Sequence, residues 1–406
     1  MPKFVLILLL SSFLLFWRLG DTHLSNWDEA WYADVSRTIA EKGNVLTPTW
    51  NGQPFLEKPP LHYWLTAISY RIFGDSEFSA RFISAVAGIG TTLLAYKFGG
   101  LSSALILLST PAFLWRARTG NLDSLLTFLI FLSAVYPSGA ASGLAFLTKG
   151  FIGFFYPLFY HRRSLILGSI IAGVWFLVSY VVNGQVFLQQ FFAQQGEKIG
   201  SIRFSLDYII HLKTGLKLWF IIFFPAMYFV RKKLKNFVLF VCLFLLFLSF
   251  LQEKSTWFLM PVYPFIALIV GRWIPKRYLL AVLIIAIFQI IYFRSEYFVP
   301  DVAADEARVS IASQQLTKED DIIYLTHYYY PTAVYYSRRK TYAVYAENPS
   351  VTWWILPKSS WGEILGGSRI FINTTRDDLK ELERQFPTIR FETLFSSGDK
   401  LLVKKV

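Results

Sequence analysis

Apolar runs separated by short polar segments dominate the first three quarters of the chain. A helix needs roughly 20 apolar residues to cross ~30 Å of hydrocarbon, and this pattern predicts about eleven membrane spans. We place them at 4–19, 79–98, 101–116, 121–136, 139–149, 151–160, 164–183, 214–230, 236–251, 256–271 and 277–294. The two runs beside Lys149 are too short to cross as straight helices, which leaves half-helices or a thinned region open.

The first apolar run, 4–19, follows Lys3 and is similar to a signal peptide. A secretory signal would end at a cleavage site of small residues, but Arg18-Leu19-Gly20-Asp21 follows this run. We therefore interpret the run as a first span that the protein keeps.

The last part of the chain, 295–406, has a different pattern. It contains strand-like runs, which are DIIYL (321–325), RIFIN (369–373) and KLLVKKV (400–406). A charged helical stretch, RDDLKELERQF, lies between two of them. This pattern predicts a soluble α/β domain of about 100 residues. The predicted fold class is therefore a polytopic α-helical membrane protein, with a transmembrane domain at 1–294 and a soluble α/β domain at 295–406.

Composition supports the membrane class and explains the charge. Charged residues make up 17% of the chain, whereas a soluble protein carries about 25%. A net charge of +13 would suggest nucleic acid as a partner of a soluble protein. In a membrane protein, cytoplasmic loops rich in Lys and Arg account for the charge without nucleic acid. Cys242 is the only cysteine, so no intramolecular disulfide can form.

Loop charges predict the orientation. With the N-terminus inside, the inside loops include the basic segments HRR (161–163), RKKLK (231–235) and GRWIPKR (271–277). The loop at 20–78 then lies outside, and eleven spans place the tail at 295–406 outside as well. In a bacterium with two membranes this outer face would be the periplasm.

The outer loop at 20–78 is too long for a simple connection. DEAWYADVSRTIAEKG has apolar residues at helical spacing and ends at Gly43, and LHYWLTAISYRIF follows two prolines as a second apolar helix. Both helices have the character of helices that lie on a membrane surface. Such a loop suits a lipid substrate whose polar head lies at that depth.

Ionisable residues gather on the same predicted face. They are Asp28, Glu29, Glu57, Lys58, Arg116, Arg118, Asp123, Lys149 and Lys254. Ionisable groups at membrane depth are costly and usually functional. Simpler interpretations stay open: the arginines and Lys254 could extend to water, and Asp28 or Asp123 could cap a helix. The FLEKPP segment could be only a turn.

The outer loop resembles the first external loop of bacterial membrane glycosyltransferases with the GT-C fold. These are the transferases of aminoarabinose and related sugars to lipid A, relatives of the protein O-mannosyltransferases. The matching pieces are the DEA–Y stretch, NG-P--EKPPLHYWL, the AR that contains Arg81, LTKG, and KSTWFLMPVYPFIAL. The resemblance covers residues 20–270. The tail agrees with the family only in forming an external domain, and it is shorter than in typical members.

The resemblance implies a polyprenyl-phosphate sugar as donor and assigns roles to individual residues. Asp28 and Asp123 match the acids at the reaction centre, and Glu57 matches a metal-binding position in some members. Lys58 matches a contact to the donor phosphate, and the further candidates for that contact are Lys149, Lys254 and, in the poorly aligned stretch 184–213, Lys198 or Arg203. One departure from the family's pattern is Phe55, where relatives often carry tyrosine.

The chemistry agrees with these residue types. A lipid phosphate is a stable leaving group that needs positive charge nearby rather than a general acid, and Lys58 could supply that charge. A hydroxyl acceptor needs a base such as Asp28, whereas a phosphate acceptor needs none. No carboxylate nucleophile is required, so we expect transfer in one step with inversion.

A divalent metal is an open possibility. Asp28 and Glu57, with Asp123 as a third candidate, offer oxygen ligands that suit Mg²⁺, Ca²⁺ or Mn²⁺ better than Zn²⁺. His62 lies close enough in sequence to change that preference. Lysine could equally balance the phosphate charge alone.

The predicted function is transfer of a sugar to a lipid A-type glycolipid, or to another envelope glycan or protein. A transporter is the main alternative, because acids and a lysine near spans could bind a substrate or relay protons. No repeated half of the chain supports it. A membrane-bound binding protein is the third possibility, and neither the sugar nor the acceptor can be named.

Overall fold

The computed structural model describes residues 2–199, 204–298, 300–328, 330–347 and 353–406. The chain forms two compact units. The first unit comprises Met1–Asp21, Ile39–Pro48 and Phe55–Pro300, and the second comprises Thr22–Thr38, Thr49–Pro54 and Asp301–Val406. The outer loop at 20–78 is therefore divided between the two units.

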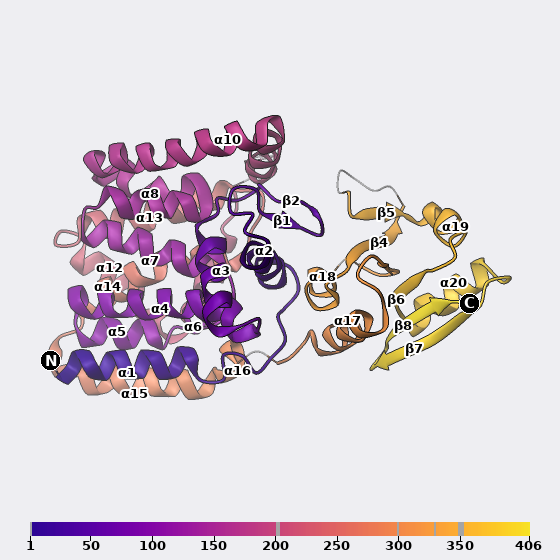
Figure 1. The fold of residues 1–406 in the computed structure, drawn as a ribbon. Helices are drawn as coiled ribbons and strands as arrows, with labels where there is room; N and C mark the ends of the chain where they lie inside the picture. The colour runs from indigo at the N-terminus through magenta and orange to yellow at the C-terminus, as the bar shows by residue number, and fades with distance from the viewer. Residues whose placement is uncertain (1, 200–203, 299, 329, 348–352) are drawn as a thin grey trace. The chain divides into compact units, whose positions relative to one another are not determined.

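The first unit is a bundle in which most of the long helices run roughly parallel or antiparallel, whereas α3 (Leu61–Phe73) runs across them (Figure 1). Its elements up to residue 160 are α1 (Pro2–Phe16), α3, α4 (Glu77–Gly99), α5 (Leu101–Leu108), α6 (Pro111–Ala117), α7 (Leu122–Val135), α8 (Gly139–Lys149), the 3₁₀ helix η1 (Gly150–Phe154) and α9 (Phe155–Tyr160). Those that follow are α10 (Arg162–Ile199), α11 (Asp207–Leu216), α12 (Leu218–Val230), α13 (Lys235–Phe250), η2 (Thr256–Val262), α14 (Tyr263–Trp273), η3 (Lys276–Tyr278), α15 (Leu279–Tyr292) and α16 (Arg294–Tyr297).

Four helical segments in the described part of the chain are long and apolar enough to cross a membrane. They are Glu77–Gly99, Gly139–Tyr160, Arg162–Ala193 and Thr256–Trp273. The predicted span at 214–230 is instead a pair of helices, α11 and α12, bent by 112° at Lys217, and this pair would make a fifth. Shorter apolar helices cover Lys3–Phe16, Leu122–Val135 and Lys235–Phe250. The count of about eleven spans stays a prediction.

The segment Gly139–Tyr160 passes this test by length and composition, but its chain reverses at Gly150. Gly150 leaves the helix with a φ of 74°. Gly153 then packs so tightly on α8 that a Cβ there would lie 2.3 Å from the carbonyl carbon of Ala145. In a continuous helix, residues eight apart are separated by ~12 Å along the axis. The two short runs beside Lys149 are therefore separate helices that fold back on each other.

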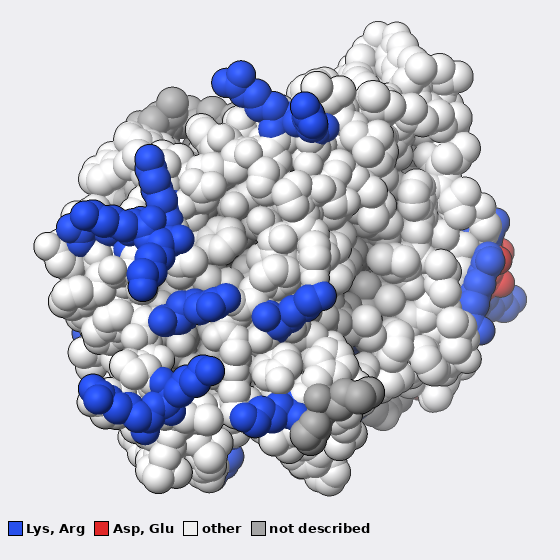
Figure 2. Space-filling model, turned by 90° about the vertical axis from the view of Figure 1, so that its left-hand side faces the viewer, with Lys and Arg blue, Asp and Glu red and all other residues white. Residues whose placement is uncertain are grey.

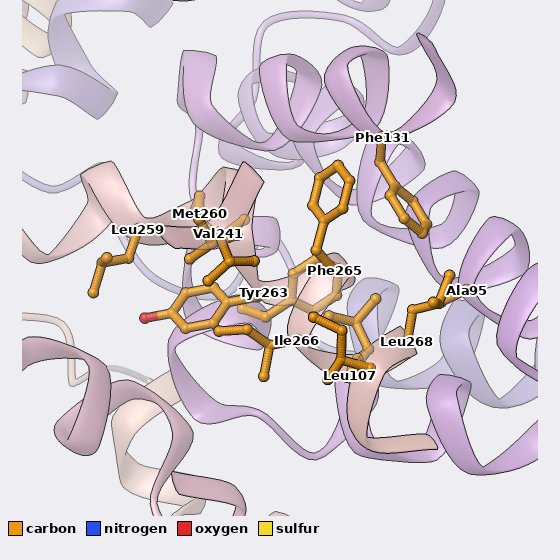
Figure 3. Close-up of a cluster of buried hydrophobic side chains, with 14 of the residues drawn as sticks. Ala95, Leu107, Phe131, Val241, Leu259, Met260, Tyr263, Phe265, Ile266 and Leu268 are labelled. Carbon is orange, nitrogen blue, oxygen red and sulfur yellow. The ribbon is translucent and has the colours of Figure 1, made fainter. Parts of the chain in front are cut away.

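Side chains of α14 occupy the centre of the bundle's core (Figure 3). The Phe265 ring lies 5.1 Å from that of Phe131 on α7 and 4.4 Å from that of Phe240 on α13, measured between centroids. Figure 3 shows Ile266 and Leu107 among the same buried side chains. This packing holds η2, the segment just before α14, in a fixed place.

One end of the bundle is strongly basic (Figure 2). There Arg272 Nε donates to the Phe98 carbonyl at 2.8 Å, which joins the ends of α14 and α4. Exposed lysines and arginines lie at the end of α4, at the start of α10, and in the α12–α13 and α14–α15 connections. They are Lys97, Arg162, Arg163, Arg231, Lys232, Lys233, Lys235, Arg272, Lys276 and Arg277. Figure 2 shows acidic atoms only at the right-hand edge of this face. The gathering of three predicted inside loops at one end agrees with the positive-inside pattern, and the orientation itself stays a prediction.

The second unit contains the predicted α/β domain. Its strands are β1 (Thr49–Trp50), β2 (Gln53–Pro54), β3 (Ile322–Leu325), β4 (Lys340–Ala346), β5 (Ile355–Pro357), β6 (Phe371–Thr375), β7 (Phe391–Ser397) and β8 (Lys400–Lys405). Its helices are α17 (Ala304–Leu316), α18 (Pro331–Ser337), η4 (Lys358–Ser360), α19 (Trp361–Ile364) and α20 (Arg376–Gln385), together with most of α2 (Asp28–Lys42). The main sheet has the order β5-β4-β3-β6-β8-β7, in which β7 and β8 are antiparallel.

Residues of the outer loop are built into this second unit. Asn51 and Thr341 exchange two hydrogen bonds of 2.8 and 2.9 Å. The Leu24 amide donates to the Tyr336 hydroxyl at 2.8 Å, and Arg37 donates to the Tyr335 carbonyl at 2.7 Å. The α/β domain therefore includes chain from far upstream of residue 295.

Replacing Gly153 with alanine tests the reversal beside Lys149. The new methyl group would overlap the main chain of Ala145, so we expect destabilisation by about 1–3 kcal/mol, the usual cost of overpacking. Thermal unfolding of the purified protein in detergent measures it. The control is Gly173→Ala, because a Cβ at Gly173 meets no atom within 4 Å. Equal melting temperatures for both variants would contradict the hairpin.

Candidate active site

Asp123 is the second residue of α7 and does not cap this helix. The side chain of Asn121 accepts hydrogen bonds from the amides of Asp123 and Ser124, at 2.9 and 3.1 Å. The N-cap residue Asn121 therefore already accepts hydrogen bonds from the free backbone amides at the start of α7. The alternative that Asp123 serves as a plain N-cap is therefore wrong, and its carboxylate can make other contacts.

Two cations hold the Asp123 carboxylate. Arg116 Nη2, at the end of α6, lies 2.5 Å from one oxygen, and Lys149 Nζ, at the end of α8, bonds the other. The Asp123 side chain is only 3% exposed. Arg116 is buried and ion-paired, so the interpretation that it extends to water is wrong. A buried carboxylate is tolerated only when it is paired and hydrogen-bonded in this way.

Arg116 and Lys149 are fixed by aromatic rings as well. The Arg116 guanidinium lies 5.3 Å from the ring centroids of both Trp115 and Trp257. The Lys149 ammonium lies 5.1 Å from the Phe258 ring. These are favourable cation–π distances, so the charges are held in place from several sides.

A cavity of about 600 Å³ opens beside this ion-paired group. Its charged lining residues are Lys58, Asp123 and Lys149. The remaining wall is almost entirely apolar and consists of Leu126, Phe151, Ile152, Phe155, Phe192, Gly196, Phe244, Phe247, Leu248, Leu251, Phe258 and Pro261. We call it the amphiphilic cavity, because it offers two ammonium groups and a long apolar surface to the same ligand.

His62 is a further group near Asp123, on the amphipathic helix α3. It is fully buried, and this burial lowers its pKa to about 4, although the negative charge of Asp123 opposes the shift. The imidazole is therefore neutral at physiological pH and adds no positive charge to the site.

Other predicted residues lie elsewhere. Lys254 Nζ donates to the carbonyls of Leu248 and Ser249, at 3.2 and 2.7 Å, which caps the end of α13. Arg118 is buried and donates to carbonyls at the end of α1, so it does not extend to water either. The role of Lys254 in binding donor phosphate stays a prediction. Arg203 and the side chain of Lys198 lie outside the described residues.

The two acids at the start of α2, Asp28 and Glu29, belong to the second unit. Asp28 is the first residue of α2 and is half-buried. Its neighbour Glu29 is 3% exposed and accepts hydrogen bonds from the Ser25 amide and hydroxyl, at 2.7 and 3.0 Å. Glu29 thus stabilises the start of α2 through its hydrogen bonds to Ser25. The catalytic role of Asp28 stays a prediction.

The proposed metal ligands do not share a unit. Glu57 belongs to the bundle and Asp28 to the second unit. Among the residues that the structure describes, no group of three or more His, Cys, Asp or Glu side chains is placed to hold a metal ion. Asp123, the buried acid of the amphiphilic cavity, is already bonded by two cations.

Comparison with known proteins places the cavity in context. A family described as dolichyl-phosphate-mannose-protein mannosyltransferase matches residues 57–187, which include Lys58, Asp123 and Lys149. The structure is similar to the crystal structure of ArnT from Cupriavidus metallidurans bound to undecaprenyl phosphate, with a TM-score of 0.79 and 18% identity, covering 98% of this chain and 97% of ArnT. The likeness to ArnT shows that the two proteins share a fold. The family match covers less than half of the chain, and both findings agree with the resemblance seen in the outer loop.

The sequence relatives match different shares of this chain. A protein from Aquifex aeolicus (strain VF5) is 29% identical over 68% of this chain and 65% of its own length. The undecaprenyl phosphate-alpha-4-amino-4-deoxy-L-arabinose arabinosyl transferase of Pseudomonas savastanoi pv. phaseolicola is 33% identical over 37% of this chain and 33% of its own. The chain thus matches about a third of that transferase in sequence.

A double-mutant cycle tests the buried ion pair. Asp123→Asn should destabilise the bundle by about 3–5 kcal/mol, because it leaves two buried cations without their counter-charge. Lys149→Gln should relieve part of that cost, with a coupling of about 1–3 kcal/mol in thermal or chemical unfolding.

Lys254→Gln is the matched control, since Lys254 contacts carbonyl groups instead. Its effect should add to that of Asp123→Asn within about 0.5 kcal/mol. Additive effects in the Asp123–Lys149 cycle would show that the two groups are not paired.

Proposed function

We propose that the protein is a membrane glycosyltransferase and that the amphiphilic cavity binds its polyprenyl-phosphate sugar donor. The cavity carries this proposal, because a polyprenyl phosphate combines one anionic group with a long apolar chain. Lys58 and Lys149 would hold the phosphate, and the phenylalanine-rich wall would cover the first isoprene units. The family match and the ArnT complex with undecaprenyl phosphate support the same donor class.

Transfer would depend on positive charge at the departing phosphate. As the bond from the sugar to the phosphate oxygen breaks, negative charge grows on that oxygen, and nearby ammonium groups stabilise it. Asp123 and the Phe258 ring keep Lys149 at its place in the cavity wall. Because a phosphate monoester leaves readily, no protonated side chain is needed, which is consistent with a neutral His62.

On the acceptor side, we propose Asp28 as the base that removes a proton from an attacking hydroxyl, with inversion at the sugar carbon. The acceptor would be a lipid A-type glycolipid or another envelope glycan or protein, on the periplasmic side of the inner membrane. The sugar could be a pentose or a hexose, since the related proteins are named for arabinose and for mannose. The protein would cross the membrane several times, with the N-terminus in the cytoplasm and the C-terminal domain in the periplasm.

A divalent ion held by Asp28 and Glu57 would add positive charge to the same reaction. The amphiphilic cavity supplies two lysines for that purpose. Transfer that survives exhaustive chelation would favour the lysines alone, and transfer restored only by Mg²⁺, Ca²⁺ or Mn²⁺ would favour the metal.

Replacing Lys58 tests the donor site. Lys58→Ala should weaken donor binding by about 2–3 kcal/mol, if it removes a charge-assisted bond to phosphate. Binding of a radiolabelled polyprenyl-phosphate sugar to the purified protein measures the change. Lys42→Ala, at an exposed position on α2, is the control and should bind donor normally. Unchanged affinity in Lys58→Ala would rule out this role.

Replacing Asp28 tests the base in an assay of sugar transfer in detergent. Asp28→Asn should fold and bind donor but transfer sugar about 10²–10⁴-fold more slowly, because asparagine begins a helix almost as well and cannot take a proton. Glu29→Gln is the control, since Glu29 serves the helix start. Near-normal turnover in Asp28→Asn would place the base elsewhere or make the acceptor a phosphate. Transfer by the purified protein also separates an enzyme from a transporter.

A further inference from the structure

A second cavity, of about 300 Å³, lies at the other end of α7 from Asp123. Its wall includes Ala134, eleven residues after Asp123 along α7, which corresponds to ~16 Å of helix. The polar lining residues are His161, Lys232, Lys233, Lys235 and Asn236, and the apolar ones are Ala134, Tyr156, Leu234 and Phe237. We call it the basic cavity. Its three lysines are among the exposed cations of the basic end, and it shares no lining residue with the proposed donor site.

Positive charge dominates the basic cavity and has no acidic neighbour along the chain. Three lysines lie within four consecutive residues at the wall. The sequence contains no Asp or Glu between residues 124 and 196 or between 208 and 252, the two stretches that form the cavity. Lys235 also begins α13, a helix of 16 residues, whose N-terminal amides add partial positive charge. An anion is therefore the complementary ligand.

Apolar side chains surround the basic cavity. Tyr156 and Phe237 form part of its wall. Leu158 and Phe159 on α9 are 54% and 50% exposed, and Leu239 on α13 is 40% exposed. These side chains lie on helices apolar enough to face lipid, so a ligand here would meet hydrocarbon beside the ammonium groups. A small soluble anion would make no use of that surface.

We propose that the basic cavity binds the phosphate headgroup of an anionic phospholipid in the leaflet opposite the donor site. The lysines would contact the phosphate, and the acyl chains would lie along α9 and α13. Basic pockets between membrane helices are a recognised way of holding such headgroups. A headgroup bound here would fix how deeply the end of α9 and the start of α13 lie in the leaflet. This proposal does not depend on the proposed enzyme activity.

Native mass spectrometry of the purified full-length protein tests the site, with phosphatidylglycerol and phosphatidylcholine as the probe lipids. The variant Lys232→Ala/Lys233→Ala/Lys235→Ala should bind phosphatidylglycerol at least ~10-fold more weakly than the wild type. Binding of phosphatidylcholine should hardly change. The control, Lys97→Ala/Lys276→Ala/Arg277→Ala, removes the same charge from exposed positions that do not line the cavity.

Three results would overturn the proposal. Equal loss in both triple variants would show attraction to the whole basic face rather than to the cavity. Competition by glycerol phosphate as effective as that by the lipid would make the ligand a soluble anion. Unchanged phosphatidylglycerol binding in the cavity variant would remove the site. If the triple variant does not fold, Lys233→Glu tests the same contact with a single change.

Discussion

The buried carboxylate of Asp123 is the constraint on which the rest of the bundle's chemistry depends. It lies in the first turn of α7 and bonds Arg116 at the end of α6 and Lys149 at the end of α8, so a single acid joins three helices. Charges removed from water in this way destabilise a protein unless each keeps a partner. Asn121 takes over the capping of α7, which leaves both carboxylate oxygens to the two cations.

The reversal at Gly150 places these charges beside an apolar cavity. Because the chain turns back immediately after Lys149, the phenylalanines of η1 and α9 lie next to the ammonium group in the same wall. Fixed charge and an apolar surface therefore meet at one place. An amphiphile with an anionic head fits this combination, which connects the local geometry to the donor proposed here.

The sequence alone could identify the ionisable residues that lie within apolar runs as candidates for the site. Asp123 and Lys149 stand out because an ionisable group inside an apolar run is costly. The helix at Leu61–Phe73 and the strands β3, β6 and β8 follow from periodicity. The sequence leaves open whether Arg116 extends to water, because its partner Asp123 lies seven positions away and their contact depends on how the turn between them folds.

Features that depend on distant pairing could not be predicted. Asn51 is hydrogen-bonded to Thr341, which lies almost 300 positions away in the sequence. No local sequence pattern indicates such a pair. The same holds for the division of the outer loop between two units. The lysines of the basic cavity were explained by the positive-inside rule, which accounts for their side of the membrane but says nothing about a cavity between them.

Photo-crosslinking tests the central claim most directly. A polyprenyl phosphate with a photoreactive group in its first isoprene units, applied to the purified protein, should label the phenylalanine-rich wall at Phe151, Phe155 or Phe244. Lys58→Ala should reduce that labelling. A second apolar groove, lined by Trp219, Ile222, Trp273 and Tyr278, has no charged residue in its described lining. Labelling confined to that groove, unchanged by Lys58→Ala, would contradict the account.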